Sequence, residues 1–303
     1  MKLKNILKKS RLINNNYPKI IDFYRQYFIS DERFVRKNFE KRLGRKLNLN
    51  NPELYNDKLQ WLKLYWNSEL ATICADKYLV RSFVEEKIGS QYLNELYKVY
   101  ERPEDVDFND LPDKFVLKGT HGSGFNFICT NKEHMNEQNV RFELNKWFNR
   151  NYFWSSREPV YRAIKPRIIV EKYIEQENGK ELRDYRFFCF NGEPKFITVD
   201  FNINDKSKTR RNLYDLDWNL LDAEISYPKE EGIRVDKPNK LSEMIELSKK
   251  LSEDFPHARI DFYYINETII FGEITFYHQS GTGIIRPQSF EKKMGEWLFL
   301  PEH

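Results

Sequence analysis

The sequence predicts an α+β protein with helices in its first part and antiparallel strands in its last part. Apolar residues recur at helical spacing in "DKLQWLKLYW", where Leu59, Leu62 and Trp66 form one stripe, and again in "ADKYLVRSFVEEKIG". After about residue 183, short strands rich in Phe, Tyr and Ile prevail. Aromatic residues make up 16% of the 303 residues, enough for a core although 32% are charged.

Three parts are expected in chain order. Residues 1–110 form a helical N-terminal region that contains the two helices quoted above. Residues 111–175 form a small α/β subdomain, with strands "KFVLKGT" and "FNFICT" and the helix "NEQNVRFELNKWF". Residues 176–303 form a C-terminal subdomain. It contains the strand-rich "RDYRFFCFNGEPKFITVDF", the helix "KLSEMIELSKKLSEDF", a hairpin and a last helix around "FEKKMGEWLFL".

The hairpin "PHARIDFYYINETIIFGEITFY" keeps an acid in each strand, Asp261 and Glu273, although acids are depleted in strands and costly to bury. A three-residue loop at 266–268 puts Asp261 opposite Glu273. It also puts Arg259 opposite Thr275, so that all four side chains share one face. A two-residue loop separates the acids, unless a β-bulge restores the shared face. Two such close carboxylates favour a cation between them, and hard oxygen ligands suit Mg²⁺. The alternative is an ordinary hairpin whose acids face solvent.

The segment "FVLKGTHGSGFNF" is a candidate phosphate-binding loop. Lys118 ends a strand and is followed by a loop with Gly119, Gly122 and Gly124. Glycines let the backbone approach phosphate oxygens and present N–H groups to them. Lys118 supplies positive charge, and Ser123 supplies a further hydrogen bond. No GK[ST] follows, so the segment is not a P-loop, and an ordinary turn is the alternative.

In "RIIVEKYIEQE", an apolar strand ends at Glu171 and Lys172. An acid at a strand end can read an adenine edge together with backbone groups, while apolar neighbours such as Ile174 sandwich the ring. Glu175 or Glu177 then reaches the ribose hydroxyls. The alternative is a strand that simply ends in charged residues.

These three segments, in this order, resemble the ATP-grasp superfamily, and "ADKYLVRSFVEEKIG" resembles the opening segment of D-alanine–D-alanine ligases. The closer resemblance is to the TupA-like ATP-grasp proteins of polysaccharide gene clusters, from about "NDKLQWLKLY" to "GEWLFLP". It includes "FVLKGTHGSG", "KPRIIVEKYI", "DYRFFCFNGEPKFI", "YDLDWN" and "FGEITFYHQSG". Phe125 departs from the Gly more usual after HGSG. The resemblance implies an ATP-grasp fold with a helical N-terminal region, a small α/β lid subdomain and a C-terminal antiparallel sheet that carries the metal site.

The resemblance implies an ADP-forming carboxylate–amine ligase that uses ATP and Mg²⁺. The ligase joins an amine, such as an amino acid, to a uronic-acid sugar of a cell-surface polymer through an acyl phosphate; the polymer is a capsule, an O-antigen or a teichuronopeptide-like chain. In this reading Arg259 stabilises the transition state. The metal is held by Asp261, Glu273 and Thr275. The nucleotide is bound by Lys77, Lys118, Gly122, Ser123, Gly124, Glu171, Lys172, Ile174, Glu177 and Arg186.

The acceptor side and two histidines leave alternatives open. Candidates for binding the acidic sugar, or its diphosphate carrier, are Arg162, Lys165, Arg167, Arg210, Arg211 and Arg286. His278 is either a ligand contact or a surface histidine, and His121 either steadies a phosphate or packs beneath the loop. Asp215-x-Asp217 favours a rival, a Mn²⁺-dependent glycosyltransferase, although it also reads as a turn. A non-catalytic surface-binding module and a kinase of the same superfamily are the other rivals.

Composition limits the remaining classes of partner and compartment. The formal net charge of +4 argues against non-specific binding of nucleic acid. Three widely spaced cysteines without CxxC spacing predict no disulfide framework or zinc site, and therefore a cytoplasmic protein. No apolar run is long enough to span a membrane. The basic start "MKLKNILKKSRLINNNYPK" predicts a solvated helix, with peripheral contact to an anionic membrane as the alternative.

Overall fold

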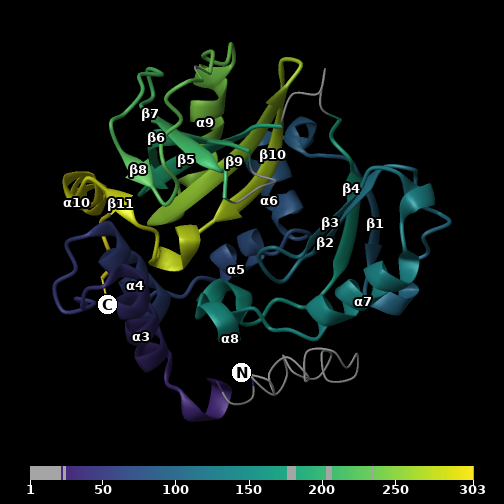
Figure 1. The fold of residues 1–303 in the computed structure, drawn as a ribbon, viewed down its shortest axis with the longest axis horizontal. Helices are drawn as coiled ribbons and strands as arrows, with labels where there is room; N and C mark the ends of the chain where they lie inside the picture. The colour runs from purple at the N-terminus through teal and green to yellow at the C-terminus, as the bar shows by residue number, and fades with distance from the viewer. Residues whose placement is uncertain (1–21, 23–24, 176–181, 203–206, 234, 303) are drawn as a thin grey trace. The chain divides into compact units, whose positions relative to one another are not determined.

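The computed structural model describes residue 22 and residues 25–175, 182–202, 207–233 and 235–302. The chain forms two compact units (Figure 1). Unit 1 combines segments within 1–34, 68–80 and 94–174, and unit 2 combines segments within 35–67, 81–93 and 175–303. Each unit has an antiparallel sheet with helices, which confirms the predicted α+β class. In the part of the chain described, no helix is both long and apolar enough to cross a membrane.

Unit 1 contains a four-stranded antiparallel sheet in the order β1-β4-β2-β3. Its strands are β1 (Leu96–Tyr100), β2 (Phe115–Gly119), β3 (Asn126–Cys129) and β4 (Ile168–Lys172). Its helices are α5 (Glu69–Ala75), α7 (Glu137–Phe148) and α8 (Phe153–Ser156). Asn136 caps α7, because its side chain accepts a hydrogen bond from the backbone N–H of Asn139.

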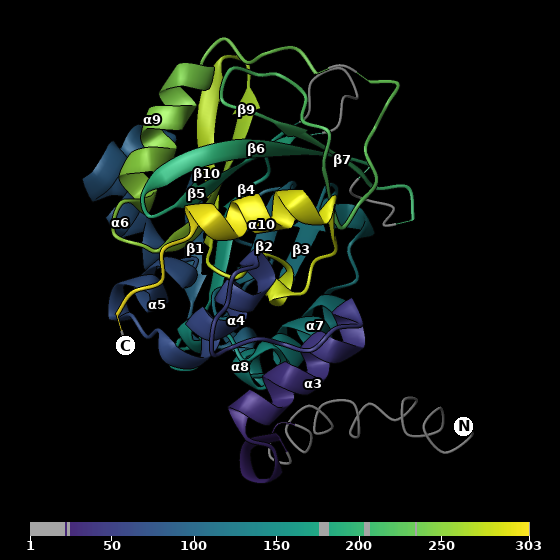
Figure 2. The ribbon, with the colours of Figure 1, turned by 90° about the vertical axis from the view of Figure 1, so that its left-hand side faces the viewer.

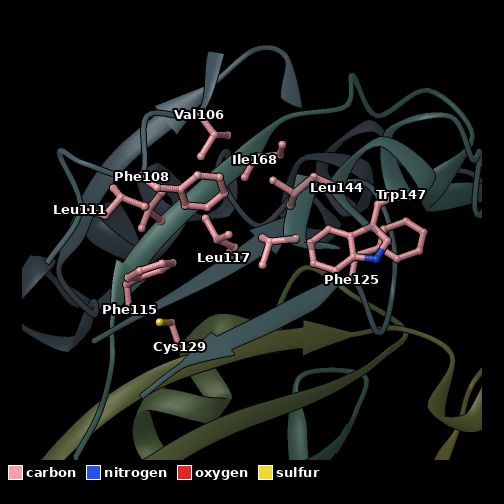
Figure 3. Close-up of a cluster of buried hydrophobic side chains, with 12 residues drawn as sticks. Val106, Phe108, Leu111, Phe115, Leu117, Phe125, Cys129, Leu144, Trp147 and Ile168 are labelled. Atoms are coloured by element: carbon pink, nitrogen blue, oxygen red, sulfur yellow. The ribbon is translucent and has the colours of Figure 1, made fainter. Parts of the chain in front are cut away.

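The core of unit 1 fills one face of this sheet (Figure 3). Phe115 and Leu117 of β2 alternate with residues on the other face, and both pack in a cluster with Leu144 and Trp147 of α7. The alternate positions of the paired strands β2 and β4 therefore face away from this core. Lys118 and Glu171 occupy two of those positions.

Unit 2 contains a five-stranded antiparallel sheet in the order β10-β9-β5-β6-β7. Its strands are β5 (Asp184–Phe190), β6 (Glu193–Phe201), β7 (Arg210–Tyr214), β9 (His257–Ile265) and β10 (Thr268–Thr275). A second, two-stranded sheet pairs β8 (Glu224–Ile225) with β11 (Ile285–Arg286). The helices are α4 (Tyr55–Tyr65), α9 (Leu241–Ser252) and α10 (Gln288–Trp297), with most of α3 (Asp31–Leu43) and α6 (Val80–Ile88).

Helices pack on both faces of the five-stranded sheet. Figure 2 shows α9 running along the sheet and α10 beside α4. Cys189, on the face toward α9, lies near the carbonyl of Ser248. On the opposite face, the ring of Trp297 from α10 packs against Phe190 and Phe196. The apolar end of this face is therefore covered by α10, and its other end carries charged side chains.

The loop of the acidic hairpin differs from the prediction. Ile265 pairs with Thr268, so the loop contains two residues, Asn266 and Glu267. Both have a positive φ, 50° and 58°, as a type I′ turn requires. The predicted three-residue loop at 266–268 is therefore wrong.

A β-bulge at Gly272 nevertheless brings the two acids together. Phe271 pairs with Phe262, but the register shifts after it, and Glu273 pairs with Asp261. A Cβ at Gly272 would lie 3.0 Å from the carbonyl oxygen of Asp261, so the close approach at the bulge favours glycine. The predicted pairing of Asp261 with Glu273 is confirmed, by way of the bulge.

Helix α4 buries a polar stripe as well as the predicted apolar one. Leu59 and Leu62 are buried as expected, whereas Trp66 lies just past the helix in extended conformation. The polar stripe consists of Asn56, Gln60 and Lys63. These three side chains donate hydrogen bonds to backbone carbonyls of the segment 280–283, which follows β10. The stripe therefore fixes that segment against α4.

His257, the first residue of β9, is a buried neutral side chain that contacts α4. Its Nδ1 donates to the carbonyl of Phe276 at 2.9 Å, because a carbonyl can only accept. Its Nε2 therefore accepts from the hydroxyl of Tyr55 at 3.0 Å. Burial lowers the pKa of His257 to about 4, with the hydrogen bond from Nδ1 opposing this and the charge of Arg259 adding to it.

We expect His257 to reduce the free energy of unfolding as the pH falls from about 6.5 to about 4, against an opposite contribution from Asp261, whose pKa is raised to about 7 in the fold. Over that range the unfolded chain gains a proton that folded His257 does not bind, a loss of up to about 3 kcal/mol. Burial also lowers the pKa of His278, which acts in the same direction. Urea unfolding at pH 7 and pH 4.5 measures the loss. His257→Gln, which cannot titrate, should reduce it, and an unchanged loss in this variant would contradict the assignment.

Candidate functional site

The predicted site residues fall into two groups, one in each unit. In unit 1, Lys118 of β2 and Glu171 of β4 form an ion pair, with 2.6 Å between Nζ and Oε2. The two strands are paired, and both residues lie on the sheet face opposite the apolar cluster. The structure therefore brings together the residue predicted for phosphate and the residue predicted for adenine.

Lys77 contacts the glycine loop. Its Nζ donates to the carbonyl of Gly122 at 2.6 Å, and its backbone N–H donates to the carbonyl of Thr120 at 3.4 Å. Asp76 fixes the turn that contains Lys77, because its Oδ1 accepts from the backbone N–H of Tyr78 at 2.8 Å. A lysine that is distant from the loop in sequence thus supplies positive charge directly to it.

The base of the glycine loop is anchored in the core of unit 1. The ring of Phe125 stacks on Trp147 (Figure 3). The same ring would collide with a Cβ at position 122, which explains the need for Gly122. His121 is buried, and its Nε2 donates to the carbonyl of Trp147 at 2.9 Å. Burial lowers the pKa of His121. Of the two alternatives for His121, packing beneath the loop agrees with the structure.

The other nucleotide residues predicted in unit 1 lie at its surface or at strand ends. Ser123 and Gly124 are exposed at the tip of the loop, and Gly124 has a positive φ of 75°. Lys172 is exposed at the end of β4, and Ile174 is half-buried just beyond it. Glu177 lies outside the described residues.

In unit 2, side chains of alternating charge cross the five-stranded sheet on one face. Glu273 of β10 lies opposite Asp261 of β9, which lies opposite Arg186 of β5. Asp200 of β6 lies opposite Arg211 of β7. Like-charged neighbours are therefore avoided from one edge of the sheet to the other, except at the pair of Asp261 and Glu273.

Arg259 neutralises the repulsion between Asp261 and Glu273 by donating hydrogen bonds to both. Its Nε and Nη2 donate to the two oxygens of Asp261 at 2.7 and 2.5 Å. The same Nη2 donates to Oε1 of Glu273 at 2.9 Å. Thr275, which pairs with Arg259, donates its hydroxyl to Glu273 at 3.0 Å. A guanidinium nitrogen therefore lies between the two carboxylates, in the place where the sequence predicts Mg²⁺.

Further contacts close a ring of side chains. Arg186 has its Nε 3.5 Å from Asp261 and donates through Nη1 to Asp200. Asp200 accepts from Nε and Nη2 of Arg211 at 2.6 and 2.7 Å. His278 contacts Arg211 through Nε2 at 3.2 Å and Arg259 through Nδ1 at 2.7 Å. We call this set the buried charge ring; its members are Arg259, Asp261, Arg186, Asp200, Arg211 and His278.

The buried carboxylates and guanidiniums of the ring depend on one another for their charge. Burial opposes the charge of Arg186, but Asp184, Asp200 and Asp261 raise its pKa overall. Burial likewise opposes the charge of Asp200, but Arg211 and Arg186 lower its pKa overall. Burial raises the pKa of Asp261 against the effect of Arg259 and Arg186, so its charged form depends on a cation beside it.

The donor set at Asp261 and Glu273 fits a hard divalent cation. Both groups offer carboxylate oxygens around one position that already attracts a positive charge. The side chain of Glu273 is 45% exposed, so solvent reaches the pair from that side. Within the described residues, no set of three or more His, Cys, Asp or Glu side chains is arranged to hold a metal ion, so a cation at this pair would need oxygens from other groups.

For the acceptor side, the expectation for Arg211 and the surface alternative for His278 need correction. Arg211 is buried and bonded to Asp200, His278 and the carbonyl of Ile225, so it is not exposed to grip a sugar. His278 is buried between two guanidiniums, so it is not a surface histidine. Exposed side chains engaged in ion pairs are Arg162, Lys165 and Arg286. Arg167 is paired with Asp76 and Glu101, and Arg210 donates to the carbonyl of Thr209.

The Asp-x-Asp pattern forms a turn. Oδ1 of Asp215 accepts from the backbone N–H groups of Asp217 and Asn219 at 3.0 and 2.7 Å. Its Oδ2 accepts from the side chain of Asn219 at 2.9 Å. The carboxylate of Asp215 is thus engaged within its own turn, as the alternative reading of this pattern expects.

Sequence reasoning missed Asp200. It lies within the apolar strand "FITVDF", and an acid within such a strand is the same signal that identified Asp261. The roles of Arg211 and His278 had no such signal, because they depend on which strands become neighbours.

Several solved structures of ligases are similar to this chain. A search of curated proteins found no match. D-alanine–D-alanine ligase from Bacillus anthracis is 16% identical, with a TM-score of 0.40 over 67% of this chain and 57% of that one. The enzyme of the same name from Helicobacter pylori is 14% identical, with a TM-score of 0.43 over 81% and 67%. Phosphoribosylamine–glycine ligase from Thermotoga maritima is 12% identical, with a TM-score of 0.40 over 69% and 49%.

The chain spans only 57% of the Bacillus ligase. The family comparison is stronger. The model "TupA-like ATPgrasp" matches residues 57–299, which include the glycine loop, Glu171 and the acidic hairpin. The predicted family is thereby confirmed, and the predicted class of enzyme agrees with it: this chain belongs to the TupA-like ATP-grasp family.

Proposed function

We propose that the protein is an ATP-dependent carboxylate–amine ligase. It forms an amide between an amino compound, such as an amino acid, and a uronic-acid sugar during synthesis of a cell-surface polysaccharide. The observation that carries this proposal is the pair of Asp261 and Glu273 around Nη2 of Arg259, within a chain of the ATP-grasp family. The polysaccharide and the uronic acid rest on the sequence resemblance.

The proposed reaction has two steps. A carboxylate oxygen of the acidic sugar attacks the γ-phosphorus of ATP, and ADP leaves. The amine then attacks the carbonyl carbon of the acyl phosphate, inorganic phosphate leaves, and the nitrogen loses a proton. Mg²⁺, when bound, neutralises charge on the transferring phosphate. No protein nucleophile is needed, because positioning and electrostatic stabilisation supply the catalysis.

Each unit has a part in this proposal. In unit 1, Lys77, Lys118 and the glycine loop bind phosphates, and Glu171 binds adenine after parting from Lys118. In unit 2, Asp261 and Glu273 hold the metal with the help of Thr275. Arg186 contacts phosphate, and Arg259 stabilises the charge that develops in the transition state.

Thermal melting with a non-hydrolysable ATP analogue and Mg²⁺ gives the first test. A ligand at about 100 times its Kd stabilises the folded chain by roughly 2.7 kcal/mol, and so raises Tm by a few degrees. We expect this shift with the ATP analogue and a much smaller shift with UDP-sugars and Mn²⁺. A shift with UDP-sugars alone would favour a glycosyltransferase, and no shift with any nucleotide would favour a binding module.

Product analysis separates a ligase from a kinase. Pairs of uronic-acid sugars and amino acids are incubated with ATP and Mg²⁺, and products are identified by mass. A ligase yields an amide together with ADP and free phosphate. A phosphorylated sugar that persists, without free phosphate, would contradict ligation.

A further inference from the structure

His278 faces a guanidinium with each of its two ring nitrogens. Nδ1 lies 2.7 Å from Nη1 of Arg259, and Nε2 lies 3.2 Å from Nη1 of Arg211. A guanidinium has only donors, so a protonated imidazole, which also has only donors, would find no acceptor here. The imidazole is therefore neutral and has one nitrogen free to accept.

The contacts identify the accepting nitrogen. Nη1 of Arg211 already has an acceptor in the carbonyl of Ile225, at 3.2 Å. The shorter contact is the one between Nδ1 and Arg259. The tautomer that fits both observations carries its proton on Nε2 and accepts from Arg259 through Nδ1. Burial and the neighbouring guanidiniums lower the pKa of His278, in agreement with a neutral ring.

The backbone around His278 is held from two sides. Gln279, Ser280 and Gly281 follow it with positive φ values of 47°, 58° and 63°. Lys63 holds this turn, because its Nζ donates to the carbonyl and the hydroxyl of Ser280 at 2.7 and 2.6 Å. The imidazole and the ring of Phe188 pack in a T-shaped arrangement, with the centroids 5.0 Å apart. The acceptor atom of His278 therefore has a fixed position.

We propose that His278 is a positioning residue for Arg259. Its neutral Nδ1 fixes the Nη1 end of the guanidinium, while Asp261 and Glu273 hold Nε and Nη2. If a metal ion takes the place of Nη2 between the two carboxylates, Arg259 keeps its bond from Nε to Asp261, and the contact to His278 holds the other end of the guanidinium. This inference rests on the proposed role of Arg259 in the ligase.

A matched pair of variants, His278→Asn and His278→Leu, tests the proposal. Asn and Leu have nearly the same shape, but only Asn offers an acceptor near the position of Nδ1. We expect His278→Leu to lower kcat about 100-fold with KM for ATP little changed, because a small displacement of a catalytic group has that effect. His278→Asn should recover most of the loss. His134→Leu, at an exposed histidine of unit 1, is the control and should leave kcat unchanged.

Equal losses in the Asn and Leu variants, or a rise in KM for ATP in place of the fall in kcat, would overturn the proposal. Equal melting temperatures of the two variants exclude unfolding as the cause of a difference between them.

Spectra of the full chain labelled with ¹⁵N-histidine and ¹⁵N-arginine test the proposal without turnover. We expect a neutral His278 ring with its proton on Nε2, assigned from the signal that both variants lack. The Nη1 protons of Arg259 should exchange about tenfold faster in the Leu variant than in the Asn variant. A charged ring, a proton on Nδ1 or equal exchange would overturn the proposal. These outcomes stand even if the wild type forms no amide, in which case only the proposed function fails.

Discussion

Glu273→Gln is expected to lower kcat for ATP-dependent turnover by about 10³-fold or more while the chain stays folded. The neutral amide cannot share a divalent cation with Asp261, and the metal's stabilisation of charge amounts to several kcal/mol at about 1.4 kcal/mol per tenfold. The fold should persist because the side chain of Glu273 is 45% exposed. ADP release measures the rate, and thermal melting measures the fold.

Glu267→Gln is the matched control for this variant. Glu267 lies in the turn of the same hairpin, is exposed, and bonds to Tyr264 and Asn239 rather than to the charge ring. It should retain wild-type turnover. Full activity in the Glu273→Gln variant would remove the metal site from the proposed mechanism.

Asp200→Asn is expected to have the largest effect on stability, a loss of about 3–5 kcal/mol in the free energy of unfolding. Asp200 is 4% exposed and lies between the guanidiniums of Arg186 and Arg211. Without its charge, two buried cations lose their shared partner. Urea unfolding at pH 7 measures the difference from the wild type.

Two comparisons make this test specific. Asp222→Asn removes an exposed acid that pairs with Lys229 at 3.5 Å, and it should change stability by less than about 1 kcal/mol. The pKa of Asp200 is lowered in the fold, so its contribution is present above the unfolded pKa of about 3.9 and is lost as the pH falls through the lower folded value. The wild type and Asp200→Asn should therefore converge in strong acid. A difference that stays constant from pH 7 to pH 3 would contradict the role of this charge.

Many helices and strands could be predicted from the sequence, because the spacing of apolar residues indicates which face of a single element is buried. The spacing of Val140, Leu144 and Trp147 predicts α7, and the structure buries all three. The hairpin shows the limit of such reasoning. Its strands follow from composition, but its register depends on backbone geometry at the turn and at Gly272, which hydrophobic pattern does not reveal.

The candidate site was predictable where a residue contradicted its own surroundings. Asp261 and Glu273 stand out as acids within apolar strands, and Lys118 stands out beside a run of glycines. The place of His278 and Arg211 in the charge ring was not predictable, because it comes from contacts between elements that are distant in sequence. The polar stripe of α4 is hidden for a related reason. Gln60 and Lys63 are ordinary residues for a solvated helix surface, and only the loop against them makes them structural.

The contact between α4 and the segment after β10 also sets an order of assembly during synthesis. Gln60 and Ser280 are 220 residues apart in the chain. At about 5–20 residues per second, the ribosome needs about 10–40 s to add that many residues. The strands of unit 1 have all been synthesised well before then. During the same interval the polar stripe of α4 has no native partner and stays hydrated. The first helices of unit 2 are therefore among the last elements to reach their native partners, and the nascent chain is open to chaperones and proteases for that interval.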